Sequence, residues 1–151
     1  MERETRYLNV DLEISGRRDL QPLVDALAPH AFPLHVGFRH GRHRAALELS
    51  ATANTTADAT IQRLSALVKA LPRGARRLWK DAERRDFNIG IQAGRQPYSF
   101  ECLVGNDALR AAAALGARVV ITVYGSGVGE RGVTRATRRP PVRAGSGGLT
   151  R

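Results

Sequence analysis

Apolar and polar side chains alternate in several short segments of this chain, and no other feature constrains the fold as strongly. Residues 7–14 show the pattern most clearly. One side of this segment is apolar and carries Leu8, Val10, Leu12 and Ile14. The other side is polar and carries Tyr7, Asn9, Asp11 and Glu13. A period of two predicts a half-buried β-strand with one face on a core and one face in water.

Five further segments show the same period and are expected to be strands. They are residues 32–38, 45–49, 87–91, 100–104 and 118–124. Turn-forming residues separate two pairs of them and predict two hairpins. In the first, Gly41 suits the first central position of a two-residue type II′ turn, which would set His40 opposite His43. In the second, the turn is residues 94–97.

Helical spacing of apolar residues predicts four helices between these strands. Asp19 is expected to cap the first, which ends at Pro29, and Thr55 with Asp58 resembles a capping box that opens the second. The third covers residues 75–83, and Asn106 or Asp107 caps the fourth, which runs to Ala117. The main elements follow the order β-α-β-β-α-β-β-α-β. We therefore expect an α+β fold with a single mixed sheet of about six strands and helices packed on one face.

The 151 residues fit one domain, and composition divides them unevenly. Residues 1–125 carry the periodic patterns and form the expected globular α+β domain. Residues 126–151 are rich in Arg, Gly and Pro and have almost no large apolar side chains, so we expect a disordered tail. The longest apolar run is too short to cross a bilayer, and the charged N-terminus is unlike a secretory signal. The sequence thus predicts a soluble cytoplasmic protein without membrane association.

The formal charge of +10 raises the question of nucleic-acid binding. Only Lys69 and Lys80 are lysines among the 24 basic residues, a bias that GC-rich coding explains as well as phosphate binding does. From Ser126 onward, six Arg stand against Glu130 and supply half of the excess charge. Nonspecific nucleic-acid binding through this basic tail is therefore one alternative for the function, but not the leading one.

Known catalytic and metal-binding patterns do not fit the reactive residues. His35, His40 and His43 lie in one predicted hairpin, but their spacing matches no familiar zinc pattern. Cys102 is expected to be a buried, inert thiol because it alternates with Phe100. The glycines of residues 125–129 precede no helical pattern that would form a phosphate cradle. We expect no metal, no cofactor and no catalytic residue, and we lean against an enzyme.

The polar side of the predicted strands is the candidate functional surface. It comprises Asn9, Asp11, Glu13, Glu48, Asn88, Gln92, Glu101, Thr122 and Tyr124, with His35 and Arg39 beside them. The leading hypothesis is a noncatalytic interaction domain that presents this face, or an edge strand, to a protein partner. A second hypothesis is a small hydrolase or isomerase that uses Asp11, Glu13 or Glu101 with His35. The partner and the oligomeric state stay open at this point.

Three segments in the second half resemble a bacterial domain family of unknown function. They are residues 87–94 (FNIGIQAG), residues 99–101 (SFE) and residues 115–124 (LGARVVITVY). The resemblance implies a small domain that ends in a helix, a Leu-Gly-Ala turn and a hydrophobic strand closed by Tyr. Proteins with these features are sometimes regarded as partner-binding or toxin-neutralising, immunity-like proteins. The resemblance implies no catalytic residues.

Overall fold

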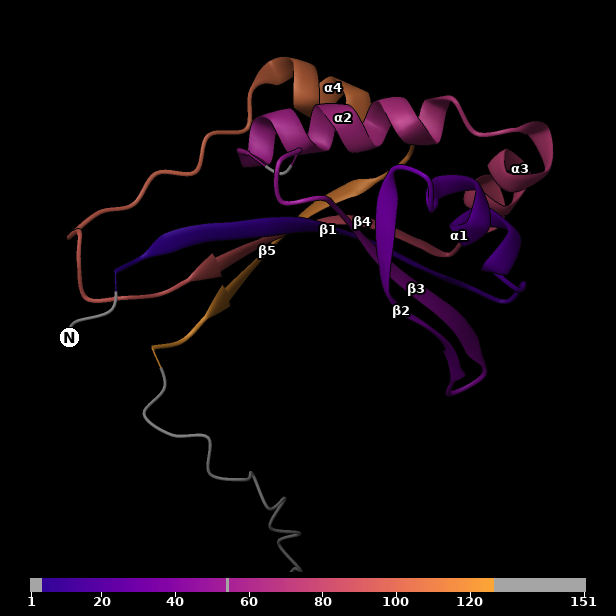
Figure 1. Cartoon of the computed structure of the whole chain (residues 1–151), viewed down its shortest axis with the longest axis horizontal. Coiled ribbons are helices and arrows are strands. Elements are labelled where there is room, and N and C mark those ends of the chain that lie inside the picture. Colours follow the sequence, from indigo (N-terminus) through magenta and orange to yellow (C-terminus); the bar gives the residue numbers. More distant parts are fainter. Residues whose placement is uncertain (1–3, 54, 127–151) are drawn as a thin grey trace, which may run out of the picture.

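The computed structural model describes residues 4–53 and 55–126, which form one mixed sheet covered by helices on one side (Figure 1). The tail predicted for residues 126–151 lies outside the described residues from residue 127 on. The strands are β1 (Arg6–Gly16), β2 (Ala31–Arg39), β3 (Arg42–Leu49), β4 (Arg84–Gln92) and β5 (Arg118–Tyr124). The helices are α1 (Gln21–Leu27), α2 (Ala57–Lys69), α3 (Arg73–Asp81) and α4 (Asn106–Ala114). No helix in the described part is long and apolar enough to span a membrane.

The strands lie in the order β2-β3-β1-β4-β5. β1 pairs antiparallel with both β3 and β4, β2 pairs antiparallel with β3, and β5 runs parallel to β4. The first four strands with α1 and α2 therefore form the split β-α-β arrangement of ferredoxin-like folds. α4 and β5 extend this sheet by one parallel crossover. The expectation of an α+β fold with a single mixed sheet is confirmed.

Within residues 4–53 and 55–126 the sheet has five strands rather than the expected six, and the prediction of a second hairpin is wrong. Residues 93–105 form an irregular connection that leaves β4 and leads up to α4 (Figure 1). One edge of β4 is bonded to β1 and the other to β5, so a strand after β4 has no free edge beside it. Parallel neighbours also need a long crossover rather than a tight turn. Cys102 and Val104 pack against the core from this connection, which explains their apolar character.

The core lies between the sheet and the helices. β1 contributes Val10, Leu12 and Ile14, all at most 2% exposed, as the alternation predicts. The pattern fails at Leu8, where the register of β1 against β4 shifts by one residue. This bulge turns Tyr7 toward α2, where its hydroxyl lies 3.5 Å from Thr60 Oγ1. Leu8 is left on the uncovered side, opposite to its expected direction.

The helices begin close to the expected positions, with different caps. Thr56 rather than Thr55 caps α2, because its hydroxyl accepts a hydrogen bond from the Ala59 amide. Asp58 instead accepts a 2.7 Å hydrogen bond from the Gly105 amide and so joins the start of α2 to the start of α4. Asp19 accepts a hydrogen bond from the amide of Gln21, the first residue of α1, but Leu20 rather than Asp19 occupies the N-cap position.

The turn of the β2–β3 hairpin also differs from the expectation. His40 and Gly41 are its two central residues, with φ of 53° and 73°. Two positive φ values are typical of a type I′ turn, whose twist matches that of the strands. His43 therefore lies opposite Phe38 rather than His40, and the two rings are 4.8 Å apart.

This turn generates a stability prediction. A Cβ at Gly41 meets no atom within 4 Å, so Gly41→Ala changes only the backbone preference. Because an L-residue is strained at positive φ, we expect the free energy of unfolding to fall by about 1 kcal/mol in urea denaturation. Gly74→Ala is the matched control, since Gly74 also has open space but lies inside α3. Equal effects of the two substitutions would contradict the assigned turn.

Candidate functional site

No described helix covers the sheet face opposite α1–α4, and the strand register arranges the side chains of that face in cross-strand rows. We call this side the open face. One row is Phe32, Glu48, Asp11, Asn88 and Val120. The next row is His35, Ala46, Glu13, Asp86 and Arg118. Asn9, Thr122, Gln92 and Tyr124 continue this face toward the end of β5. Segments far apart in the sequence thus meet in one surface.

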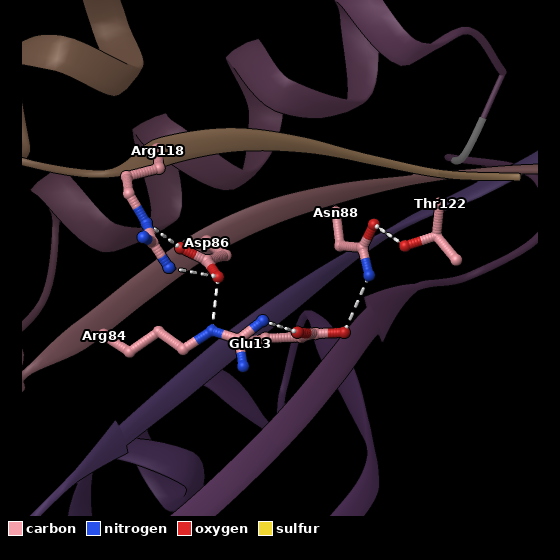
Figure 2. A network of polar contacts seen from close by, with 6 residues as sticks. All are labelled: Glu13, Arg84, Asp86, Asn88, Arg118 and Thr122. Carbon is pink, nitrogen blue, oxygen red and sulfur yellow. Dashed lines mark hydrogen bonds and ion pairs between the residues drawn. The ribbon is translucent and has the colours of Figure 1, made fainter.

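A hydrogen-bonded network joins β1, β4 and β5 across this face (Figure 2). Arg118 donates two hydrogen bonds, of 2.8 and 3.0 Å, to the Asp86 carboxylate. Arg84 bonds both to Asp86 and, at 2.9 Å, to Glu13. Asn88 donates to the other oxygen of Glu13 at 2.9 Å and accepts from Thr122 at 2.8 Å. Both carboxylate oxygens of Glu13 are therefore engaged with neighbours.

Asp86 anchors this network, although the sequence analysis did not select it. Its side chain is fully buried beneath two arginines. Burial acts to raise the pKa of Asp86, but the hydrogen bonds and charges of Arg118 and Arg84 outweigh it and hold that pKa below its ordinary value. Extending the alternation one residue back from Phe87 would have placed Asp86 on the polar side. Its burial, however, depends on Arg84 and Arg118, which only the pairing of β4 with β5 brings together.

A second cluster lies beside the network and carries uncompensated negative charge. Asn9 donates hydrogen bonds of 2.8 Å to Asp11 and 2.9 Å to Glu48 and so bridges the two carboxylates. Burial, with the charges of Glu48 and Glu13, raises the pKa of Asp11 from 3.8 to about 6. No ion pair to Asp11 or Glu48 is present in residues 4–53 and 55–126. This part of the open face is acidic.

Apolar side chains flank the acidic cluster on two sides. Phe32 lies next to Glu48 on the neighbouring strand and is 58% exposed. On the other side, Leu8 and the Tyr124 ring approach Gly90, each to 3.6 Å from where a Cβ would stand. They are 37% and 48% exposed. Gly90 also leaves room for the Asn9 side chain, whose oxygen would lie 2.8 Å from that Cβ.

A shallow hollow of about 210 Å³ lies on the same face near the hairpin. Glu13, Ser15, His35, Arg44 and Arg84 contribute to its lining. Of the residues of the hydrolase or isomerase hypothesis, Glu13 and His35 share this hollow, whereas Asp11 does not line it. No hydrogen bond links His35 to a carboxylate within the described segments. The enzymatic alternative stays a prediction that the geometry does little to support.

Two selected residues lie away from the rest. Arg39 ends β2 opposite Arg42, at the turn of the hairpin. Glu101 belongs to the irregular connection of residues 93–105 rather than to a strand, so its assignment to the sheet face is wrong. Gln92 lies at the margin, where its amide donates to the carbonyls of Tyr124 and Gly125 and ties the end of β5 to β4.

The other reactive groups form no recognisable centre. Among the described residues, no group of three or more His, Cys, Asp or Glu is arranged to hold a metal ion. Cys102 is half-buried, and burial raises the pKa of its thiol, which disfavours the nucleophilic thiolate. Comparison with protein-family models, with curated proteins and with solved structures finds no match to this chain. The resemblance to a bacterial family of unknown function therefore stays a prediction.

The raised pKa of Asp11 predicts a specific pH dependence of stability. Because its folded pKa of about 6 exceeds the value of about 4 in an unfolded chain, the folded state binds the extra proton between these values. The favourable contribution is complete below pH 4 and is lost as the pH rises through 6. We expect Asp11→Asn to be more stable than the parent at pH 7.5, by about 1 kcal/mol after allowance for solvent screening.

The difference should narrow below pH 6 and close near pH 4, as measured by urea denaturation at each pH. Asp107→Asn provides the control, because Asp107 is an exposed carboxylate on α4. A pH-independent difference for Asp11→Asn would show that the effect has another origin.

Proposed function

We propose that this chain is a noncatalytic protein-interaction domain whose open face binds another protein. The docking surface consists of Leu8, Asn9, Asp11, Phe32, Glu48 and Tyr124. The composition of this surface supports the proposal: an acidic centre, held in position by hydrogen bonds, lies between exposed aromatic and aliphatic side chains. None of the helices α1–α4 covers this face (Figure 1).

The exposed apolar groups supply anchors for a partner. Aromatic side chains are enriched at protein interfaces and at the positions that contribute most to binding, because they bury a large area at a low cost in entropy. Phe32 and Tyr124 lie on opposite margins of the surface, and each leaves about half of its side chain in contact with water. A partner that covers both must also cover the acidic centre between them.

The acidic centre supplies specificity. Asp11 and Glu48 are held together by Asn9, so their charges are in place before a partner binds. Burial, with the charges of Glu48 and Glu13, raises the pKa of Asp11, and an incoming Arg, Lys or backbone N–H group would stabilise the charged carboxylate. We therefore propose that the partner presents basic or hydrogen-bond-donating groups at this point.

The polar network argues for a binding surface over a catalytic one. Glu13 and Asp86 have their carboxylate oxygens bonded to arginine or asparagine donors of the same chain. Such bonds fix the shape and charge of the surface. They leave these groups poorly placed to accept a proton from a substrate, because a general base needs a free lone pair within reach of that proton.

The experiment is a comparison of single variants in partner capture. The tagged full chain is used to capture proteins from the source cells, the captured partner is purified, and its affinity is measured by calorimetry. We expect Phe32→Ala and Glu48→Gln each to weaken binding by about 5- to 30-fold, corresponding to a loss of about 1–2 kcal/mol. Circular dichroism establishes that each variant is folded.

Tyr98→Ala and Asp107→Asn are the matched controls. Both residues are exposed and lie off the open face, one in the connection of residues 93–105 and one on α4. The controls should bind as the parent does. Unchanged affinity in both open-face variants, or equal losses in variants and controls, would reject this docking surface.

A further inference from the structure

We propose that β5 is a dimerisation edge, and that two copies of this chain join their β5 strands antiparallel around a two-fold axis at Ile121. The inference does not rest on the proposed function, since it is argued from the free edge of β5, although Tyr124 also belongs to the docking surface. It begins from the position of β5, which is last in the strand order and, within the described residues, pairs only with β4.

The two edges of the sheet differ in how they are protected. β2 contains Pro33 and Gly37, a register shift between Pro33 and His35, and a terminal Arg39. Proline, bulges and charges are the usual features that prevent an edge strand from pairing with another chain. β5 reads Arg-Val-Val-Ile-Thr-Val-Tyr and has no such interruption after Arg118. An extended edge of this kind is a template for an additional strand.

The side chains of β5 are apolar yet incompletely covered. Val119, Ile121 and Val123 share the side that faces the helices, as do their neighbours Phe87, Ile89 and Ile91 on β4. The β4 residues are buried, but Ile121 and Val123 remain 61% and 60% exposed. The C-terminal part of β5 runs out from beneath the helix layer (Figure 1). Another strand alongside would cover these two side chains from the free edge.

The backbone groups indicate the register of the added strand. The Tyr124 carbonyl points toward β4, because it accepts a 2.8 Å hydrogen bond from the Ala93 amide. Alternation along the strand then directs the N–H and C=O groups of Val119, Ile121 and Val123 to the free edge. In an antiparallel pair centred at Ile121, Ile121 meets its own copy and Val119 meets Val123 of the other copy. All of these outward groups then find partners.

The same register is self-complementary in its side chains, which is why we commit to a second copy as the occupant. On the helix side, branched aliphatic residues meet branched aliphatic residues. On the open face, Val120 meets Thr122, and Arg118 meets Tyr124 of the other copy. No like charges face each other, since Arg118, already bonded to Asp86, is the only charged residue of the strand. Cross-strand pairs of these types stabilise antiparallel sheets.

Site-specific cross-linking tests the register in the full chain with Cys102→Ser. Ile121→Cys places two thiols directly opposite each other, at a Cα separation of about 5.5 Å that a disulfide can span. We expect most of this variant to form covalent dimers under mild oxidation. Val123→Cys is the matched control, because its partner across the axis is Val119, and it should remain largely uncross-linked. Cross-linking of Val123→Cys but not Ile121→Cys would overturn the register.

Analytical ultracentrifugation of the unmodified chain tests the dimer itself. We expect a species of twice the 16.4 kDa monomer mass. Ile121→Lys sets two like charges opposite each other and should raise the dissociation constant at least about tenfold. Phe38→Lys, at an equally exposed apolar residue near the other edge, should leave it unchanged.

Three outcomes would overturn the proposal. One is a parent chain that is monomeric at several hundred micromolar. Another is a dimer that Ile121→Lys does not weaken, which would place the interface elsewhere. The third is a full chain that is monomeric while a chain ending at Gly125 dimerises, which would identify the C-terminal segment as the occupant of the β5 edge.

Discussion

The pairing of β1 on both of its edges is the constraint on which the rest of this structure depends. Hydrogen bonds to β3 and β4 fix β1 in the middle of the sheet, with Val10, Leu12 and Ile14 beneath the helices. The residues between them, Asp11 and Glu13, must then project from the centre of the open face. The same alternation that builds the core therefore positions the carboxylates of the candidate site, and a one-residue slip would lose both.

The open face keeps its carboxylates in two contrasting electrostatic environments. Asp86 is buried between Arg84 and Arg118, and these cations hold its pKa low. Asp11 lies one row away beside Glu48 and Glu13, and its pKa is raised to about 6. The first environment is satisfied within the chain and stiffens the sheet across β1, β4 and β5. In the environment of Asp11, the neighbouring carboxylates repel one another, and a partner's positive charge would relieve this repulsion. The part of the face around Asp86 is therefore structural, and the part around Asp11 is the proposed binding site.

The two edges of the sheet differ in how readily they can pair with another strand. In β2, a proline, a glycine and a bulge disfavour pairing with a further strand. β5 instead has an extended backbone with apolar residues on its helix side. Pairing through β5 would join two open faces into one continuous surface, with Tyr124 and Arg118 of opposite copies at its middle. The docking surface and the dimerisation edge thus share Tyr124, and a dimer would bring the docking surfaces of the two copies next to each other.

Periodicity alone indicated which segments could be strands or helices. It also indicated which side of β1, β3 and β4 faces solvent, because the alternation of apolar and polar residues follows burial. It could not determine the fate of residues 93–105, where Cys102 and Val104 pack against the core without forming a strand. Strand pairing depends on which edges other strands already occupy. The sequence also did not predict the bulge at Leu8 or the positive φ at His40, because both depend on the twist and register of paired strands. Asp86 and its two arginines became a site only when the parallel pairing of β4 and β5 brought them together. Residue types and their spacing specify what each segment can bury, but only tertiary pairing decides which charges become neighbours.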